Sequence, residues 1–327
     1  MTAPFVTRAF SRLRHESRRA ARALVVTCGL GDRLDVVLDR RRALGRMAPG
    51  GWHDRLLALL ETGVVVRTDA AWASPSTASI PLVMCLWNRP ERIHEIVDML
   101  QGLDHPVRLL LWNNAEDQRE TYAWVESHVP RGSLESVDIV HSPENIGGLA
   151  RFVAVRFLRN SGYDGPVVML DDDQDVAASF VDDLLADYRP DRIAAWWAFD
   201  FGPSYWDRVQ IDVGSRADHG GTGGTVMDAS LVDDDSFFLS LPERYAFLED
   251  QWMSHYAHSL GWTIVKTKTE IGFVLEHKNQ YHGLHDRKDE FHRHLMDGSI
   301  SSGARIGSSA TGRRRARLRR ASPARRG

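Results

Sequence analysis

Cysteine and long apolar runs are scarce in this chain of 327 residues. Its two cysteines, Cys28 and Cys85, are too few for a disulfide framework, so a reducing cytoplasm is the expected compartment. The longest apolar stretches, such as residues 80–87, are far shorter than the roughly 20 residues of a membrane-spanning helix. Six arginines within the first 22 residues interrupt the apolar core that a secretory signal peptide needs. We therefore expect a cytoplasmic protein without a membrane span.

Acidic residues are absent from one end of the chain and scarce at the other. The formal net charge is −3, yet residues 1–46 sum to +7 and residues 304–327 to +9, which leaves −19 for the residues between them. An acidic body argues against nucleic acid as a partner, because a nucleic-acid-binding domain carries positive charge on its folded surface. The basic ends could hold the protein at the inner, anionic face of a membrane, or they could be solvated and disordered.

Composition divides the chain into three regions. Residues 1–79 are predicted to form an Arg-rich, mainly helical extension, with a helix near residues 56–60 and a Ser/Pro/Thr/Ala linker at the end. Residues 80–300 are predicted to form the main domain. Ser, Gly and Arg dominate after that and cannot form a core, so residues 301–327 are predicted to be a disordered basic tail.

Strands and helices alternate through the main domain. Repeated βα units of this kind predict a mixed, mostly parallel α/β sheet with helices on both faces, in which ligands bind at the carboxyl ends of the strands. The polar residues that follow the strands, and so fall at this edge, are Asn88, Asn113, Asn114 and the acidic run 171–175. The predicted strands are residues 80–87, 107–112, 137–141, 166–170 and 271–276, and helices are predicted from Asn88 as cap, over 116–128, after Gly148 and from Phe180.

The strongest single signal is an apolar strand that delivers a cluster of carboxylates, VVMLDDDQD at residues 167–175. Clustered carboxylates repel one another unless a cation neutralises them, and oxygen-only ligands suit Mg²⁺ or Mn²⁺ bound to phosphate. A solvated acidic loop is the alternative. A calcium loop is excluded, because Val176 stands where that loop needs Gly and Asp182 stands where it needs Glu.

Four segments match the motifs of one family in order and spacing. They are Ile80–Pro90 (IPLVMCLWNRP), Ser142–Leu149 (SPENIGGL), Leu170–Asp173 (LDDD) and Phe247–Trp262 (FLEDQWMSHYAHSLGW). They resemble, in turn, the first strand with its Asn-containing turn, the Asn-x-Gly-Gly segment, the Asp-x-Asp motif and the acidic helix start of family 2 glycosyltransferases. The resemblance covers roughly two thirds of the chain and implies the Rossmann-like GT-A fold.

The resemblance also implies roles for the matching residues. Asp171 and Asp173 would bracket the metal and the donor, with Asp173 as the direct metal ligand and Asp175 as its substitute, because the acidic run leaves the register open. His277 would complete the metal site, with His282 as the second candidate. The implied donor-binding residues are Asn88, Arg89, Asn113, Asn114, Asn145, Gly148, Asp171, Asp172, Gly223 and Gly224.

Glu249 and Asp250 are the implied catalytic pair. Asp250 would act as the general base, with Glu249 beside it, and remove a proton from the acceptor hydroxyl as its oxygen attacks the anomeric carbon. Attack opposite the leaving diphosphate inverts the configuration, and the metal stabilises the charge on that diphosphate. Alternatively, the two residues are partners of the helix dipole. The inner face of their helix is predicted to carry Trp252, Met253, Tyr256 and Leu260.

We therefore predict an inverting, metal-dependent glycosyltransferase that uses Mn²⁺ or Mg²⁺ and a UDP-sugar. The base stays open, because Asn113-Asn114 stand where the family often has an Asp that contacts it. A glycan, a lipid-linked compound or a small molecule would be the acceptor. A nucleotidyltransferase is the alternative enzyme, although residues 87–90 lack the glycines of its phosphate loop. An inactive nucleotide-sugar-binding module is the third reading.

Overall fold

The computed structural model of the chain describes residues 51–62, 65–66, 79–142, 145–274, 284–298 and 319–320. Nearly all of them belong to one compact unit, made of residues 49–278 and 286–327. The predictions for residues 1–50, for the linker, for most of the basic tail and for His277 and His282 lie outside the described residues. Among the helices that are described, none is long and apolar enough to cross a membrane.

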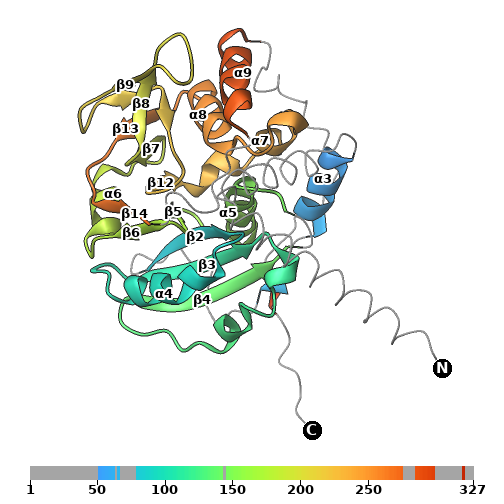
Figure 1. Ribbon diagram of the computed structural model, residues 1–327, viewed down its shortest axis with the longest axis vertical. Helices are drawn as coiled ribbons and strands as arrows, with labels where there is room; N and C mark the ends of the chain where they lie inside the picture. Colours follow the sequence, from blue (N-terminus) through green and yellow to red (C-terminus); the bar gives the residue numbers. More distant parts are fainter. Residues whose placement is uncertain are drawn as a thin grey trace, which may run out of the picture. The chain divides into compact units, whose positions relative to one another are not determined.

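An eight-stranded mixed sheet forms the centre of this unit (Figure 1). Its order is β10 (Arg216–Ala217), β13 (Thr263–Lys266), β7 (Arg192–Ala195), β12 (Thr225–Asp228), β5 (Pro166–Asp171), β2 (Ile80–Leu86), β3 (Val107–Asn113) and β4 (Leu134–His141). Strands β5, β2, β3 and β4 are parallel, whereas β12 runs antiparallel to both of its neighbours. β13 is parallel to β7, and β10 is antiparallel to β13. The predicted mixed, mostly parallel sheet of the Rossmann-like α/β class is confirmed.

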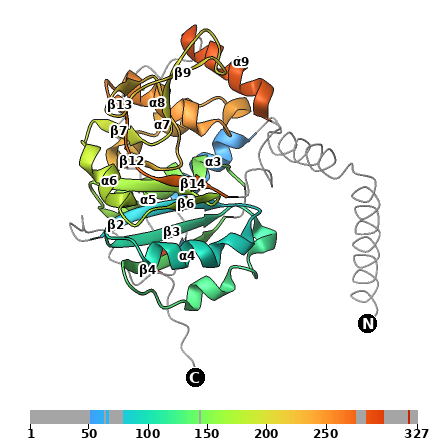
Figure 2. The same cartoon turned by 60° about the vertical axis from the view of Figure 1, so that its left-hand side comes forward.

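The central strands are continuous apolar runs because helices cover both faces of the sheet. Leu82, Val83 and Met84 alternate between the two faces, and all three are fully buried. Helices α4 (Ile93–Gln101) and α6 (Phe180–Asp187) share a core with Leu82 and Met84. Helix α5 (Leu149–Ser161) packs against β2 and β3 from the other side (Figure 2). Further helices are α3 (Trp52–Thr62), α7 (Ser236–Leu239), α8 (Glu249–Ser259) and α9 (His285–Met296).

The strand order of the sheet has a topological switch point between β2 and β5. From β2 the chain moves outward through β3 and β4, and it then returns to place β5 on the other side of β2. Cys85, near the end of β2, lies opposite Asp171, the last residue of β5. Ligands of open α/β sheets bind at such a switch point, outside the carboxyl ends of the strands. The acidic run therefore begins at the position where this fold favours a ligand.

Smaller sheets lie outside the central one. β6 (Gln174–Val176) pairs antiparallel with β14 (Ile271–Phe273), directly after the acidic cluster. β8 (Ala198–Phe201) pairs with both β9 (Arg208–Gln210) and β11 (His219–Gly220). In addition, β1 (Val65–Val66) pairs with β15 (Arg319–Arg320), so two residues of the basic tail take part in a strand pair.

Two predictions about helices are corrected by the structure. The helix expected to begin with Asn88 as its cap begins with a 3₁₀ turn at Pro90–Arg92, and no side chain caps either that turn or α4. The helical segment expected over residues 116–128 consists of two 3₁₀ turns, Glu116–Gln118 and Ala123–Ser127. That segment lacks the sustained apolar periodicity that a full helix needs.

Two predictions near the C-terminal half are also corrected. Leu260 does not lie on the inner face of α8, because the helix ends at Ser259 and the Leu260 side chain is 51% exposed. The strand expected over residues 271–276 is shorter among the described residues, Ile271–Phe273, and it pairs with β6 instead of joining the central sheet.

Candidate active site

The acidic run is held by arginines from two other elements. Arg89, in the turn after β2, pairs with Asp172, and its Nη2 lies 3.2 Å from Oδ2 of Asp173. Arg151, in the first turn of α5, places Nη1 2.8 Å from Oδ1 of Asp171. Both arginines and Asp172 and Asp173 are buried. These ion pairs cross the switch point and join the ends of β2 and β5 to α5.

A third arginine pairs with the last carboxylate of the acidic run. Arg92, which is 5% exposed, places Nη2 2.6 Å from Oδ1 of Asp175. Burial raises the pKa of the Asp172 carboxyl to about 6, and Arg89 opposes this rise. The repulsion within the acidic run is therefore relieved by three arginine side chains, a solution that the sequence analysis assigned to a metal ion alone.

The described carboxylates do not make a metal centre by themselves. No group of three or more His, Cys, Asp or Glu side chains suited to a metal occurs among the described residues, and His277 is not among them. Mg²⁺ needs less from the protein, because it is commonly bound by one or two carboxylates together with substrate phosphates. A metal role for Asp171 stays a prediction. Its Oδ2 lies beside Gly223, where a Cβ would come within 2.4 Å of it.

The predicted asparagines make hydrogen bonds within the loops at the same edge. Asn113 accepts a hydrogen bond from the N–H of Ala115 and donates one to its carbonyl. Asn114 accepts from the N–H of Ile146 and donates to the carbonyl of Gly147. Oδ1 of Asn145 accepts from the N–H of Gly147. These bonds tie the loop after β3 to the loop before α5, and a role of the asparagines in donor binding stays a prediction.

Glu249 faces the acidic run from the start of α8. A Cβ added to Gly148 would lie 1.6 Å from Oε1 of Glu249, so any other residue there would force this carboxylate to move. Burial raises the pKa of Glu249 to about 7, partly opposed by Arg151, while the charges of Asp250 and Asp171 add to the rise. Glu249 therefore belongs to the same electrostatic group as the Asp171–Arg151 pair.

Asp250 lies in a second group of side chains. Its Oδ1 accepts a hydrogen bond from the N–H of Gln251, and its Oδ2 lies 3.6 Å from Nε2 of His219. Burial acts to raise the pKa of Asp250. The charge of Lys288, together with the other neighbours of Asp250, outweighs burial and lowers this pKa. The Asp250 side chain is 21% exposed. Asp250 is thus an ionised carboxylate that a ligand can reach.

His219 lies beside Asp250 as a neutral group. The side chain is fully buried, and burial lowers the pKa of its imidazole to about 4. At neutral pH the ring is uncharged, so the positive charge that stabilises Asp250 comes first from Lys288 on α9 and then from Arg151. The pKa of Lys288 is raised because Asp250 and Tyr205 outweigh its own burial.

The glycine-rich loop 220–224 lies between the acidic run and a group of aromatic side chains. Gly223 faces Asp171 and Gln174, as its virtual Cβ contacts show. Gly224 has a φ of +76°, which favours glycine, and its carbonyl accepts a hydrogen bond from the N–H of Trp196. The predicted Gly223 and Gly224 are therefore brought to the site.

Other residues of the site were not predicted as such. They are Arg92, Arg151, His219, Lys288 and Trp196. One of them left a signal in the sequence, since Arg151 interrupts a helix whose other early residues are apolar, and a buried arginine needs an acidic partner. Cys85 also lies here, but burial raises its pKa to about 12, so its thiol is protonated and is not a nucleophile.

No protein-family model and no curated protein matches the chain. The fold is similar to that of the inositol-1-phosphate CTP transferase from T. maritima, with 13% identity and a TM-score of 0.39 over 65% of this chain and 97% of that chain. It is also similar to the bifunctional glycosyltransferase WbbM in its apo structure, with 13% identity and a TM-score of 0.31 over 58% of this chain and 38% of that chain.

Both of these proteins are transferases by name. The chain spans well under half the length of WbbM. At these identities a likeness concerns the fold alone, and at these TM-scores it carries no argument about activity. The function has to be argued from the site.

Proposed function

We propose that the protein is an inverting glycosyltransferase, which moves a sugar from a nucleotide-diphosphate donor to an acceptor hydroxyl. The donor would lie at the switch point between β2 and β5, near the Asp171–Arg151 pair. UDP-sugars are the first donors to test. The proposal places the acceptor on the side of Asp250, whose side chain is 21% exposed.

One observation carries the proposal: two adjacent carboxylates begin α8 beside the acidic run and have different environments. A hydroxyl acceptor must lose a proton as it attacks, so it needs a base within reach. A phosphate nucleophile is already an anion at neutral pH, because its second pKa is about 6. An ionised carboxylate on the proposed acceptor side can accept that proton, so it favours transfer to a hydroxyl over transfer to a phosphate.

The chemical step needs three contributions from the described residues. Asp250 takes the proton of the acceptor hydroxyl while the oxygen forms a bond to the anomeric carbon and the bond to the diphosphate breaks. Lys288 keeps Asp250 ionised before the step. Arg151 and Arg89 provide positive charge at the strand ends, where the leaving diphosphate gains negative charge.

Metal dependence is part of the proposal. Asp171 and Asp173 would hold Mg²⁺ or Mn²⁺ with the phosphate oxygens of the donor, and Asp175 and His277 remain further candidates. The ion would neutralise the leaving diphosphate. The Asp173→Ala variant should lose the Mn²⁺-dependent rise in melting temperature that UDP causes. Its metal-free stability should stay level or rise, since Arg89 keeps Asp172 as its partner. A marked fall in metal-free stability would make Asp173 structural.

A nucleotidyltransferase remains the second candidate, because strand-end carboxylates also serve that reaction. Incubation with UDP-sugars, or with nucleoside triphosphates and sugar phosphates, separates the two by product. Release of a nucleoside diphosphate supports glycosyl transfer, and release of pyrophosphate supports nucleotidyl transfer. Nucleotide binding without any turnover would indicate an inactive binding module.

We also propose a cytoplasmic enzyme that contacts the inner face of a membrane through its basic ends. The support is the charge segregation, +9 over residues 304–327 against −19 over residues 47–303. Anionic lipids attract such segments by roughly 1 kcal/mol per basic residue near the surface. A lipid-linked acceptor would then be within reach, and glycans and small molecules stay open as acceptors.

A further inference from the structure

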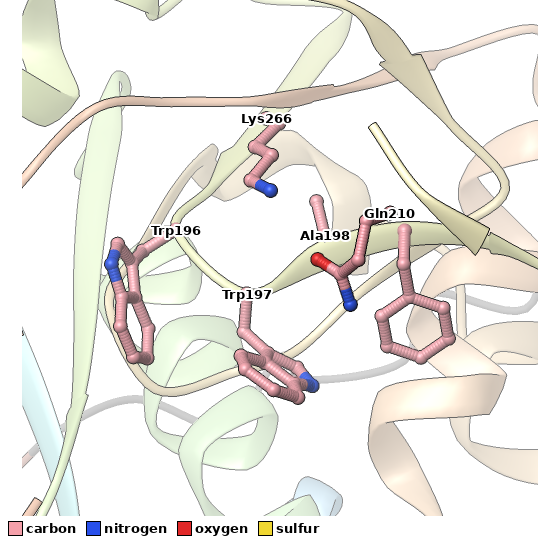
Figure 3. A pocket seen from close by; sticks show the side chains of 6 residues that line it. Trp196, Trp197, Ala198, Gln210 and Lys266 are labelled. Carbon is pink, nitrogen blue, oxygen red and sulfur yellow. The ribbon is translucent and has the colours of Figure 1, made fainter. Parts of the chain in front are cut away.

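A small aromatic cavity lies beside the candidate active site (Figure 3). Its volume is about 140 Å³, and its lining is Trp196, Trp197, Ala198, Phe199, Gln210 and Lys266. Figure 3 shows the side chains of Trp196, Trp197, Gln210 and Lys266 arranged around a common space. An apolar wall with a few polar groups is typical of a small-molecule site.

The topology brings this cavity to the edge of the sheet that carries the acidic run. Trp196 follows β7 and Lys266 ends β13, and both strands run in the same direction as β5. Their carboxyl ends therefore meet the same edge as Asp171. Only β12 separates β7 from β5 in the sheet.

The glycine-rich loop 220–224 contacts both the tryptophans of the cavity and Asp171. The N–H of Gly221 donates to the carbonyl of Trp197 at 2.7 Å, and the N–H of Trp196 donates to the carbonyl of Gly224 at 2.9 Å. Gly223, between these two bonds, faces Asp171. The cavity and the proposed donor site thus lie on either side of one five-residue loop.

Trp197 is a large apolar residue, yet 38% of its surface is accessible to solvent. It is also held in place, because the Arg208 guanidinium lies 5.8 Å from its ring centroid and within 4.9 Å of the Phe199 and Tyr205 rings. Trp196 packs at 5.6 Å from the ring of Phe273, which is 44% exposed. A supported, exposed indole offers a flat apolar face at little cost in conformational entropy.

We propose that this cavity binds the acceptor as a saccharide, with one sugar ring stacked on Trp197 and its hydroxyls directed to Gln210 and Lys266. The inference rests on the proposed function, and it names the acceptor class that Asp250 would serve. The C–H face of a pyranose suits an indole, and its hydroxyls suit an amide and an ammonium group. A cavity well below the roughly 300 Å³ of a drug-sized site suits a single ring.

A lipid chain is the less favoured occupant. Such a chain needs an extended apolar groove, whereas this cavity is small and has an amine and an amide in its lining. The amine is oriented, since Nζ of Lys266 donates a hydrogen bond to the carbonyl of Ile211 at 2.9 Å. Binding of farnesyl phosphate in place of a sugar would overturn the assignment.

The test measures saccharide binding by the full chain without any donor. Saturation-transfer NMR would be recorded with methyl glycosides of glucose, galactose, mannose and N-acetylglucosamine, and affinities would be taken from titrations in the millimolar range. Trp197→Ala should weaken binding by about tenfold, and Trp197→Phe, which keeps a stacking face, by about threefold or less. Trp206→Ala is the matched control, because Trp206 is 40% exposed but does not line the cavity.

The outcomes separate this inference from the proposed function. Loss of binding in Trp197→Ala, with Trp206→Ala unchanged, supports the subsite whether or not sugar transfer is detected. In the transfer assay, Trp197→Ala should raise KM for the acceptor while kcat and donor hydrolysis stay level. Transfer with an unchanged acceptor KM in Trp197→Ala, equal losses in both tryptophan variants, or no binding of any glycoside would overturn the subsite.

Discussion

Glu249 and Asp250 are adjacent in sequence, yet their carboxylates meet different surroundings. Consecutive residues of a helix point about 100° apart, so two neighbours can face two sites. Glu249 lies with Arg151 and Asp171, and Asp250 lies with His219 and Lys288. One carboxyl has a raised pKa and the other a lowered pKa, a pattern that assigns different tasks to paired carboxylates in many active sites.

Asp250→Asn is the residue-scale test of the base. The variant keeps the shape of the side chain and cannot take a proton, so transfer should fall by about 10²–10⁴-fold at saturating donor. Binding of the nucleotide diphosphate should stay level, because it depends on residues at the ends of β2 and β5. Glu249→Gln should cost less.

Retention of more than about a tenth of wild-type turnover in Asp250→Asn would exclude Asp250 as the base. The pH profile then shows which residue acts instead. If Asp250 is the base, its lowered pKa keeps it ionised between pH 8 and pH 5, so the rate should not fall in this range through protonation of the base. With Glu249 as base, the rate should fall as the pH drops through about 7.

Glu249→Gln also tests the raised pKa without any assay of activity. Between about pH 4.5 and pH 7 the folded chain keeps a proton on Glu249 that the unfolded chain has released, so this residue makes stability fall as the pH rises. The variant should match wild type near pH 5 and exceed it at pH 8, by on the order of 1–3 kcal/mol. Urea unfolding at the two pH values measures this.

The control for that experiment is Glu120→Gln, since Glu120 is exposed. It should leave the pH dependence of stability unchanged. An identical dependence in wild type and Glu249→Gln would mean that the Glu249 carboxyl is solvated in the folded protein. Asp172 and His219 also titrate in or near this pH range. Wild type and both variants contain them, so they do not contribute to the differences in stability.

At the scale of elements, the glycine-rich loop before β12 sets the position of the first carboxylate. A Cβ on Gly223 would lie 2.4 Å from Oδ2 of Asp171 and 2.7 Å from the amide of Gln174. Gly223→Ala must therefore displace one of these side chains. We expect about tenfold weaker binding of nucleotide diphosphate and a stability loss of about 1–3 kcal/mol.

Gly272→Ala on β14 is the matched control for the loop. A Cβ there meets no atom within 4 Å, so neither binding nor stability should change beyond about 0.5 kcal/mol. Calorimetric titration with UDP measures both variants. Equal binding by Gly223→Ala and wild type would show that the loop does not position Asp171 for the donor.

The central strands could be predicted because each is an unbroken apolar run that ends in a polar residue. β2, β3 and β5 were placed within one residue at each end, since burial on both faces leaves no ambiguity in their pattern. The 3₁₀ turns at Glu116–Gln118 and Ala123–Ser127 could not be told from a helix, and the pairing of β14 with β6 is a long-range contact. Local pattern carries no information on such contacts.

The acidic residues of the site could also be predicted, because strand ends and helix starts place them. Their partners could not. Arg89 and Asp172 are 83 residues apart, and Arg92 and Asp175 are equally far apart. Nothing in the local sequence pairs these arginines with the aspartates, so the sequence alone predicted a metal ion as the group that neutralises the carboxylates. The cavity at Trp197 was missed for the same reason, since the turn after β7 and the strands β8, β9 and β13 build it together.

At the scale of the whole molecule, charge is divided between an acidic body and basic ends. Deleting residues 311–327 removes β15 and its pairing with β1, but it should leave the turnover of a soluble acceptor unchanged, because neither strand carries a residue of the candidate site. Binding to vesicles with anionic lipid should weaken, and the difference should vanish at high salt. Cosedimentation measures this, and equal vesicle binding with and without the segment would remove the membrane proposal.

The central claim is that a sugar passes from a nucleotide diphosphate to a hydroxyl in one displacement assisted by Asp250. The most direct measurement is NMR of wild type and Asp250→Asn with UDP-sugars and a saccharide acceptor. Phosphorus spectra identify the released nucleotide, and proton couplings give the anomeric configuration of the product. We predict UDP and a glycoside of inverted configuration in equal amounts, with both lost together in Asp250→Asn. Pyrophosphate as the product, or a glycoside of retained configuration, would contradict the account.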